Sequence, residues 1–508
     1  MLDSDFATLP DLIAAHARDT AGRGDRIAVA DDRGSVSYAD LDAAMDRVAA
    51  ALQRDHIPAG SAIAILAAPS VDYAIVFLGA LRAGCIAAPI APSATPASIA
   101  AMIADCGAPI VFVDADNAAA LAGEAIAVPI VEFDRTFADW ITPEGSVPTP
   151  VAIAPGDGFN IIYSSGTTGV PKGIVQSHAM RWAHISRNVA AGFDEAVTML
   201  ATPLYSNTTL VSFLPTLGWG GTAVLMRKFD ARGYLELAQR HRATHTMLVP
   251  VQYQRIMAVS DFDAFDLAAF RFKTSTSAPF AAALKKDVVD RWPGALVEFY
   301  GMTEGGASTA LNATEFPDKL HTVGKPMPGH DMRLIDEEGR EVAPGAMGEV
   351  VGRSPTMMTG YHGRADATRD AEWHDADGNR YIRHGDVGRF DEDGFLILMD
   401  RKKDLVISGG FNIYPTDLEA ELAQHPAVGE CAVVGVASEA WGETPVGFYV
   451  ARPGFEHEDA GAIMAWTNAR LGKTQRLSQL HRIDEMPRSA IGKILKRELR
   501  DSLVEQMA

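Results

Sequence analysis

A short stretch rich in hydroxyl groups and glycine, SSGTTGVPK, occupies positions 164–172. Glycines let backbone N–H groups converge on anionic oxygens, hydroxyls add donors, and a lysine supplies a compact positive charge. The composition therefore predicts a loop that holds phosphate groups, although a surface loop without a ligand would share it. The loop is not of the Walker type, because two residues rather than four separate its glycines. The residues expected to contact phosphate are Ser164, Ser165, Gly166, Thr167, Thr168, Gly169 and Lys172.

A second stretch, YGMTEGG at positions 300–306, follows the apolar segment ALVEF. Tyr300 could stack on a base, Thr303 could bond a phosphate, and Glu304 could bind Mg²⁺ through its carboxylate. Thr303 could instead cap the N-terminus of a helix, which is a common role for threonine.

Two further segments each present one residue that could contact a nucleotide. In YIRHGDVGRFDEDG (381–394), Asp386 could accept hydrogen bonds from both hydroxyls of a ribose, and a turn-forming aspartate is the alternative. In PRSAIGKILK (487–496), a turn of small residues presents Lys493, which could reach the site of another domain or remain a surface lysine.

The elements that position these segments alternate between apolar strands and helices over the first 300 residues. Such alternation predicts parallel sheets flanked by helices, in the α/β class. Ligands in such folds bind at the carboxyl ends of the strands, where the segments of Ser164 and Thr303 both lie. Ser37 is expected to cap the helix that follows it. The expected strands fall within 61–68, 108–116, 222–229, 245–250 and 295–301.

The pattern of expected elements changes after about residue 325, where many turn-forming segments separate short expected strands. This pattern predicts a β-rich lobe, followed by a small α+β piece. We place a domain boundary at Asp400, which gives an N-terminal domain of residues 1–399 and a C-terminal domain of residues 400–508.

Composition excludes several classes of protein. The 508 residues carry a net charge of −20, which argues against nucleic-acid binding. Three scattered cysteines fit neither a disulfide framework nor a zinc site. The acidic N-terminus lacks the features of a secretory signal, and the apolar stretch 71–92 contains Asp72, Arg82 and Pro89, so it reads as a buried helix and strand. A cytoplasmic protein without an integral membrane segment is expected.

Taken in order, these segments resemble the adenylate-forming superfamily, which includes acyl- and aryl-CoA synthetases, peptide adenylation domains and beetle luciferases. The resemblance covers nearly the whole chain. It includes SVSYADL, SSGTTGVPKG, YGMTE, GEVVGRSPTMMTGYHG, HGDVGRFDEDGFLILMDRKKDLVISGGFNIYP and PRSAIGKILK.

The resemblance implies a two-step reaction that uses ATP, Mg²⁺ and coenzyme A. A carboxylate attacks the α-phosphate of ATP to give acyl-AMP and pyrophosphate, and a thiol then displaces AMP. By the same resemblance Thr303 bonds the α-phosphate, Glu304 reaches Mg²⁺ and Lys493 is the catalytic lysine. Tyr300 lies against adenine, and Asp386 and Arg401 hold the ribose.

The resemblance also implies that the C-terminal domain is mobile and rotates between the two steps. Asp400 falls at the family's hinge position. After rotation, a loop with Ser408, Gly409, Gly410 and Phe411 would face the adenylate and help to form the tunnel for the thiol.

Two positions depart from the family pattern, and both concern the acyl pocket. Ser206 stands where a histidine is common, and Thr276 replaces a glycine. The paired glycines Gly305 and Gly306 suggest a slot for a flat ring or a chain. We therefore expect an aryl or phenylpropenoid acid, or a medium-chain fatty acid. The predicted pocket residues are Tyr205, Ser206, Thr276, Gly301, Gly305 and Gly306.

Among the branches of the superfamily, a freestanding CoA ligase fits best, as a monomer or a homodimer. The rival is an adenylation enzyme that loads a carrier protein; peptide adenylation domains usually hold an ammonium group with a pocket aspartate, which the stretch 204–213 lacks. A luciferase-like oxygenase fits less well. A non-catalytic nucleotide-binding protein would have lost Lys172, Glu304 or Lys493, and all three are present.

Overall fold

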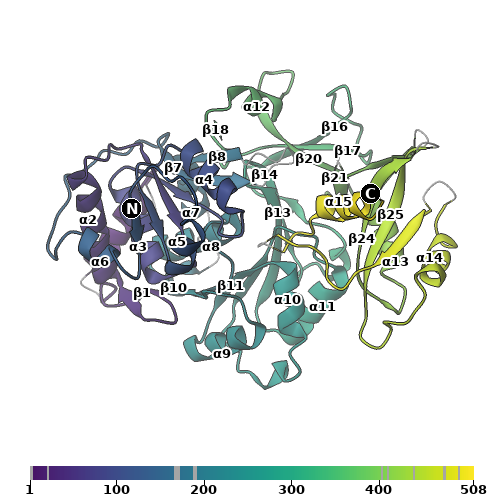
Figure 1. Cartoon of the computed structure of the whole chain (residues 1–508), viewed down its shortest axis with the longest axis horizontal. Helices are drawn as coiled ribbons and strands as arrows, with labels where there is room; N and C mark the ends of the chain where they lie inside the picture. The colour runs from purple at the N-terminus through teal and green to yellow at the C-terminus, as the bar shows by residue number, and fades with distance from the viewer. Residues whose placement is uncertain are drawn as a thin grey trace. The chain divides into compact units, whose positions relative to one another are not determined.

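The structure is a computed structural model, whose helices and strands are drawn in Figure 1. It divides into two compact units. The first unit comprises Met1–His321, Pro326–Asp331 and Gly352–Ile382, and the second comprises Thr322–Lys325, Met332–Val351 and Arg383–Ala508. The described residues are 4–19, 22–164, 172–186, 192–401, 404–408, 411–438, 441–472, 476–489 and 492–507. For positions 164, 400–401, 411–412 and 504–507 the description covers the backbone only.

One sheet of the first unit has seven strands, in the order β18 (Gly360–Tyr361), β8 (Lys172–Ser177), β7 (Gly158–Ser164), β4 (Ile86–Pro89), β3 (Ala62–Leu66), β5 (Val111–Val113) and β6 (Ile130–Glu132). The strands from β7 to β6 run parallel. β8 and β18 extend the sheet in antiparallel pairs. Every residue of β3 is buried, as expected for a strand covered on both faces.

A second sheet has nine strands, in the order β15 (Lys325–Pro326), β14 (Gly305–Asn312), β13 (Ala295–Met302), β12 (Phe272–Ser275), β11 (His245–Leu248), β9 (Val197–Leu200), β10 (Thr222–Leu225), β1 (Ile27–Ala30) and β2 (Ser35–Ser37). The strands from β13 to β1 run parallel. β14 and β2 pair with their neighbours in the antiparallel sense.

Helices lie between the two sheets and on their outer faces. The helices α1 (Leu9–Ala17), α2 (Tyr38–Arg54), α3 (Val71–Arg82) and α8 (Asn207–Trp219) share one apolar core with strands of both sheets. The outer face of the seven-stranded sheet packs on α4 (Pro96–Asp105). The outer face of the nine-stranded sheet packs on α9 (Ala231–His241), α10 (Pro250–Met257) and α11 (Ala282–Arg291). The first unit also contains α5 (Ala115–Ala120), α6 (Phe137–Trp140), α7 (His178–Ser186) and α12 (Ala365–Asp370).

The start of α2 shows how local sequence sets an element. The Ser37 side chain accepts a hydrogen bond from the Asp40 backbone N–H, and the Asp40 side chain accepts one from the Ser37 backbone N–H. This capping box satisfies two of the N–H groups that a helix start leaves unpaired. It confirms the cap predicted at Ser37.

A third sheet has most of its residues in the second unit. Its order is β16 (Asp331–Ile335), β17 (Gly348–Arg353), β20 (Arg380–Phe390) and β19 (Glu372–His374), and β21 (Leu396–Arg401) pairs with β20.

The remainder of the second unit is a sheet with helices on both faces. Its order is β23 (Phe411–Ile413), β22 (Val406–Ser408), β25 (Gly442–Ala451) and β24 (Val428–Ser438), and β26 (Gln479–Arg482) pairs with β25. α13 (Pro415–Leu422) and α14 (Ala460–Asn468) share a core with Val433, while α15 (Lys496–Met507) packs with Val434. Successive residues of β24 thus face opposite helices, as the pleat requires.

Across the described ranges, no helix has both the length and the apolar character that spanning a bilayer requires.

Candidate functional site

The predicted phosphate loop lies largely outside the described residues. This holds for Ser165, Gly166, Thr167, Thr168 and Gly169, and also for Gly409 and Gly410 of the predicted CoA loop. The backbone of Ser164 ends β7 and pairs with Lys172, the first residue of β8.

Three side chains of the first unit meet at the end of this hairpin. Nζ of Lys172 lies 5.2 Å from the centre of the Tyr361 ring, within the range of a cation–π contact. The Tyr361 hydroxyl donates a 2.8 Å hydrogen bond to Oε1 of Glu304. Burial, and then the charge of Glu304, raise the pKa of Tyr361, so the hydroxyl stays protonated at neutral pH. Tyr361 therefore contacts both the lysine predicted to bind phosphate, Lys172, and the glutamate predicted to bind the metal, Glu304.

The sequence prediction missed Tyr361. The residue lies in β18, where it pairs with Ile174 of β8, and this pairing brings it beside Lys172. In the sequence, Tyr361 is marked only by its place in GEVVGRSPTMMTGYHG, one of the segments that resemble the family.

Thr303 and Glu304 form the turn of the β13–β14 hairpin, so no helix begins at Thr303 and the helix-cap alternative is wrong. Nε2 of Gln176 donates a 2.7 Å hydrogen bond to the carbonyl of Thr303. The backbone N–H of Met358, in the segment before β18, donates a 2.8 Å bond to the carbonyl of Glu304. Both carbonyls of the turn are thus held by groups from other elements.

Gly305 permits a close approach of two backbone segments. Its φ is +84°, and a Cβ atom built on it would lie 1.9 Å from the carbonyl oxygen of Thr356 and 2.7 Å from Cα of Met357. The space beside Gly305 is therefore filled by backbone. The slot predicted from the missing side chain is wrong for this position, because the glycine is needed for packing. Gly306 is buried, has a φ of +74°, and its carbonyl accepts a hydrogen bond from the Ser354 hydroxyl.

Two other predicted residues of this hairpin lie in β13. Gly301 is exposed, and a Cβ atom there would lie 2.7 Å from Oγ of Ser308. Tyr300 is half-buried and pairs with Thr309 of β14.

Ser206, at the first departure from the family pattern, is the N-cap of α8. It is buried, and its hydroxyl accepts a 3.3 Å hydrogen bond from the Thr208 backbone N–H. The residue at this departure therefore acts as the N-cap of α8, a position that serine favours. The preceding Tyr205 is half-buried, and burial raises the pKa of its hydroxyl.

The second departure, Thr276, is half-buried after the end of β12. The next residue, Ser277, has a φ of +81°, which is rare for a residue other than glycine. Its hydroxyl forms a 2.6 Å hydrogen bond with the hydroxyl of Thr208 in α8. This contact holds the loop after β12 against the start of α8, so Ser206 and Thr276 belong to neighbouring segments.

The predicted ribose residues lie in the second unit. Asp386 of β20 is half-buried and pairs in register with Arg401 of β21, whose backbone alone is described. Asp400, the predicted hinge, pairs with Val387 through its backbone. The neighbouring His384 is buried, and burial lowers its pKa to about 4.

Lys493 lies in a tight turn of the second unit. Its backbone N–H donates a 3.2 Å hydrogen bond to the Ser489 hydroxyl, and its carbonyl accepts a 2.8 Å bond from the Ser489 N–H. Gly492, with a φ of +76°, precedes it. The turn predicted to present this lysine is therefore present.

Ser408 and Phe411 are the described members of the predicted CoA loop. Ser408 ends β22, and its backbone pairs with those of Phe411 in β23 and Gly442 in β25. The loop thus connects two neighbouring strands of the second unit.

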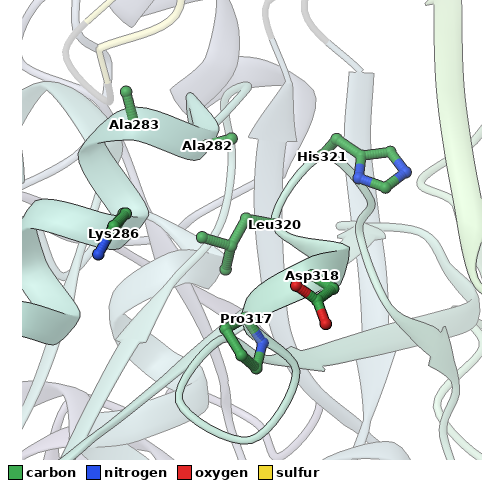
Figure 2. A pocket seen from close by; sticks show the side chains of 7 residues that line it. All are labelled: Ala282, Ala283, Lys286, Pro317, Asp318, Leu320 and His321. Atoms are coloured by element: carbon green, nitrogen blue, oxygen red, sulfur yellow. The ribbon is translucent and has the colours of Figure 1, made fainter.

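A shallow hollow of about 320 Å³ lies on the first unit between α11 and the 3₁₀ helix η4 (Pro317–Lys319). Figure 2 shows Leu320 at its centre, with Lys286 and His321 on opposite sides. None of the predicted site residues lines it.

Comparison with known proteins identifies the family. The family model "AMP-binding enzyme" matches residues 16–362, and "AMP-binding enzyme C-terminal domain" matches residues 417–493. The chain is 32% identical to a feruloyl-CoA synthase from Amycolatopsis sp, over 92% of this chain and 94% of that protein. It is 29% identical to the fatty acid–[acyl-carrier-protein] ligase ScoC from Streptomyces coeruleorubidus, over 92% of this chain and 91% of that protein.

Among solved structures, ATP-bound MatB from Rhodopseudomonas palustris superposes with a TM-score of 0.86 and 27% sequence identity, covering 98% of this chain and 99% of that one. The chain belongs to the AMP-binding enzyme family. This confirms the predicted membership of the adenylate-forming superfamily and the predicted α/β fold.

Proposed function

We propose that this chain is an ATP-dependent carboxylic acid:CoA ligase. In the first step a carboxylate oxygen attacks the α-phosphate of ATP, which forms acyl-AMP and releases pyrophosphate. In the second step the thiol of CoA attacks the acyl carbon, which forms acyl-CoA and releases AMP. The observation that carries the proposal is the contact of Lys172 with Tyr361 and of Tyr361 with Glu304, which brings together a cation and a carboxylate at the strand that follows the hydroxyl-rich segment in the sequence.

The first step brings an anionic acid against a triphosphate, so positive charge and hydrogen-bond donors must gather there. We assign the β- and γ-phosphates to Lys172 and the loop that precedes it. Thr303 bonds the α-phosphate, and Lys493 stabilises the charge that develops between the carboxylate and that phosphate. Tyr300 contacts adenine, and Asp386 and Arg401 hold the ribose.

The surroundings of Glu304 fit a magnesium ion bound together with ATP. Tyr361 occupies Oε1 of its carboxylate, and no hydrogen bond to Oε2 is found among the described residues. Mg²⁺ in nucleotide sites typically takes one or two carboxylate oxygens and completes its shell with phosphates and water. When bound, Mg²⁺ would supply positive charge to the phosphates, while Tyr361 fixes the direction of the carboxylate.

We further propose that residues 400–508 form a mobile domain that turns about Asp400 between the two steps. In one orientation this domain presents Lys493 for adenylation. In the other, Ser408, Gly409, Gly410 and Phe411 line the path of the CoA thiol. The C-terminal family model begins at residue 417, which supports a separate domain in this region.

For the acid, we propose an aryl or phenylpropenoid acid, with a medium-chain fatty acid as the second choice. The similarity to a feruloyl-CoA synthase supports an aromatic acid. The half-buried ring of Tyr205 and the hydroxyls of Ser206 and Thr276 suit an aromatic acid with polar substituents.

A second candidate function is the loading of an acyl group onto a carrier protein. It shares the first step, and the similarity to the carrier-protein ligase ScoC favours it.

We also propose a cytoplasmic monomer or homodimer that does not bind nucleic acid. Light scattering after size exclusion would give its mass.

Pyrophosphate release tests these proposals. The purified chain is incubated with ATP, Mg²⁺ and single acids from a panel of aryl acids, cinnamate-like acids and C4–C12 fatty acids, each with and without CoA. Multiple turnover that requires CoA for one class of acid is the expected result. Release without a CoA effect, followed by transfer to an acyl carrier protein, would favour the second function. No release with any acid would contradict the proposed acids.

A further inference from the structure

Arg181 of α7 is a charged residue in the interior of the first unit. It is 1% exposed. Its Nε donates a 2.9 Å hydrogen bond to Oδ1 of Asn160, its Nη1 donates a 2.8 Å bond to Oδ1 of Asn207, and its Nη2 donates a bond to Oε1 of Gln176. The guanidinium also lies 5.9 Å from the centre of the Phe159 ring.

All three acceptors are neutral amides, and within the described part of the chain no carboxylate forms an ion pair with Arg181. Burial lowers the pKa of the guanidinium to about 9, so it remains charged at neutral pH. Buried charges in proteins are usually paired with an opposite charge, because desolvation is otherwise costly. The three amides satisfy donors of Arg181 without neutralising its charge, so the role of Arg181 depends on what these amides contact in turn.

The acceptors of Arg181 lead to two segments of the proposed active site. Gln176, which accepts from Arg181, donates a 2.7 Å hydrogen bond from Nε2 to the carbonyl of Thr303. Asn207 is the first residue of α8 and follows Ser206, the N-cap at the acyl-pocket position. These hydrogen bonds form two branches from Arg181. The branch through Gln176 ends at the Thr303–Glu304 turn, which is assigned to ATP, and the branch through Asn207 ends at the start of α8, which is assigned to the acid.

We propose that Arg181 is a positioning residue that fixes the start of α8 relative to the Thr303–Glu304 turn. The acid and the α-phosphate of ATP are thereby held in a fixed position relative to each other. The proposal rests on the proposed function of these two segments. The planar guanidinium has donors that point in different directions, so it can reach three acceptors at once. A lysine carries its three donors on one nitrogen, so it cannot reach acceptors that lie on three separate elements, β7, β8 and α8.

The two branches can be broken separately. Asn207→Ala removes the branch to α8 and is expected to raise KM for the acid roughly tenfold, with KM for ATP within about twofold, since a hydrogen bond to a charged group is lost. Gln176→Met keeps the side-chain volume but removes the branch to Thr303, and is expected to lower kcat roughly tenfold with little change in KM for the acid. Arg181→Met should show both effects, and Arg181→Lys should restore no more than one.

Lys273 provides a matched control. It is also fully buried, and its Nζ donates to three neutral groups, the carbonyls of Trp292, Pro293 and Gly294. These carbonyls precede β13, at the amino end of the strand, whereas the Thr303 turn follows its carboxyl end. Lys273→Met therefore removes a buried, hydrogen-bonded amine without touching the contacts of Arg181 with Gln176 or Asn207, and we expect a loss of stability without the split between KM and kcat.

Hydrogen–deuterium exchange supplies a readout that does not depend on activity. In Arg181→Met, peptides covering 203–210 and 299–306 should exchange faster than in the wild type, and in Lys273→Met they should not. The positioning role is overturned if exchange of these peptides is unchanged in Arg181→Met, or if Lys273→Met gives the same kinetic pattern. If the wild type releases no pyrophosphate with any acid, the proposed acids are contradicted, while the exchange data still decide the role of Arg181.

Discussion

Replacement of Gly305 by alanine tests the close approach between the β13–β14 hairpin and the segment before β18. A Cβ atom at this position would lie 1.9 Å from the Thr356 carbonyl oxygen, far inside any normal contact, so one of the two backbones must move. The Thr356 segment is held by hydrogen bonds from Met358 to Glu304 and from Ser354 to Gly306. Movement of this segment therefore disturbs the turn that carries the proposed magnesium ligand.

The expected loss of stability has two parts. A non-glycine residue at a φ of +84° costs about 1–2 kcal/mol, and overpacking costs about 1–3 kcal/mol, so Gly305→Ala should lower the free energy of unfolding by about 2–5 kcal/mol. Gly145→Ala is the matched control, because Gly145 has a φ of +79° and nothing lies within 4 Å of its added Cβ. The control should lose only the first part, about 1–2 kcal/mol.

Urea unfolding followed by tryptophan fluorescence measures the two losses, and pyrophosphate release measures the activity of each variant. Gly305→Ala should unfold at lower urea than Gly145→Ala and lose most of its activity, while Gly145→Ala keeps it. Equal stability of the two variants, together with retained activity of Gly305→Ala, would refute the close approach of the two backbones. The space beside Gly305 could then belong to the acyl pocket, as the sequence predicted.

Three further predictions concern the proposed mechanism and the response to pH. Tyr361→Phe keeps the ring above Lys172 but loses the bond to Glu304, so a magnesium titration of pyrophosphate release should show a several-fold higher requirement for the ion; an unchanged requirement would contradict the role of Tyr361. Lys493→Ala should reduce adenylate formation by orders of magnitude yet spare thioester formation from supplied acyl-AMP, and equal loss in both half-reactions would contradict the rotation of the C-terminal domain. Burial lowers the pKa of His178 from its ordinary 6.5 to about 4, so the native state binds fewer protons than the unfolded state between these values. Stability should therefore fall as the pH is lowered from 6.5 towards 4, and urea midpoints at pH 7 and pH 5 should differ less in His178→Asn than in the wild type.

The sequence by itself determined the alternation of strands and helices and the family. Local patterns carry this information: β3 is a continuous apolar run because helices cover both of its faces, and Ser37 caps α2 through a residue only three positions away. The position of the Thr303–Glu304 turn after an apolar strand followed from the same local patterns.

Only the tertiary structure decided which distant residues meet. Tyr361 and Glu304 are 57 positions apart, and Gln176 and Thr303 are 127 apart, so no periodicity or local motif records either contact. The prediction of a slot at Gly305 failed for the same reason, because the backbone that fills the space belongs to residues 356–357. Sequence patterns report which residues an element buries, whereas contacts between elements depend on how sheets and helices pack, and that packing is fixed by the whole chain.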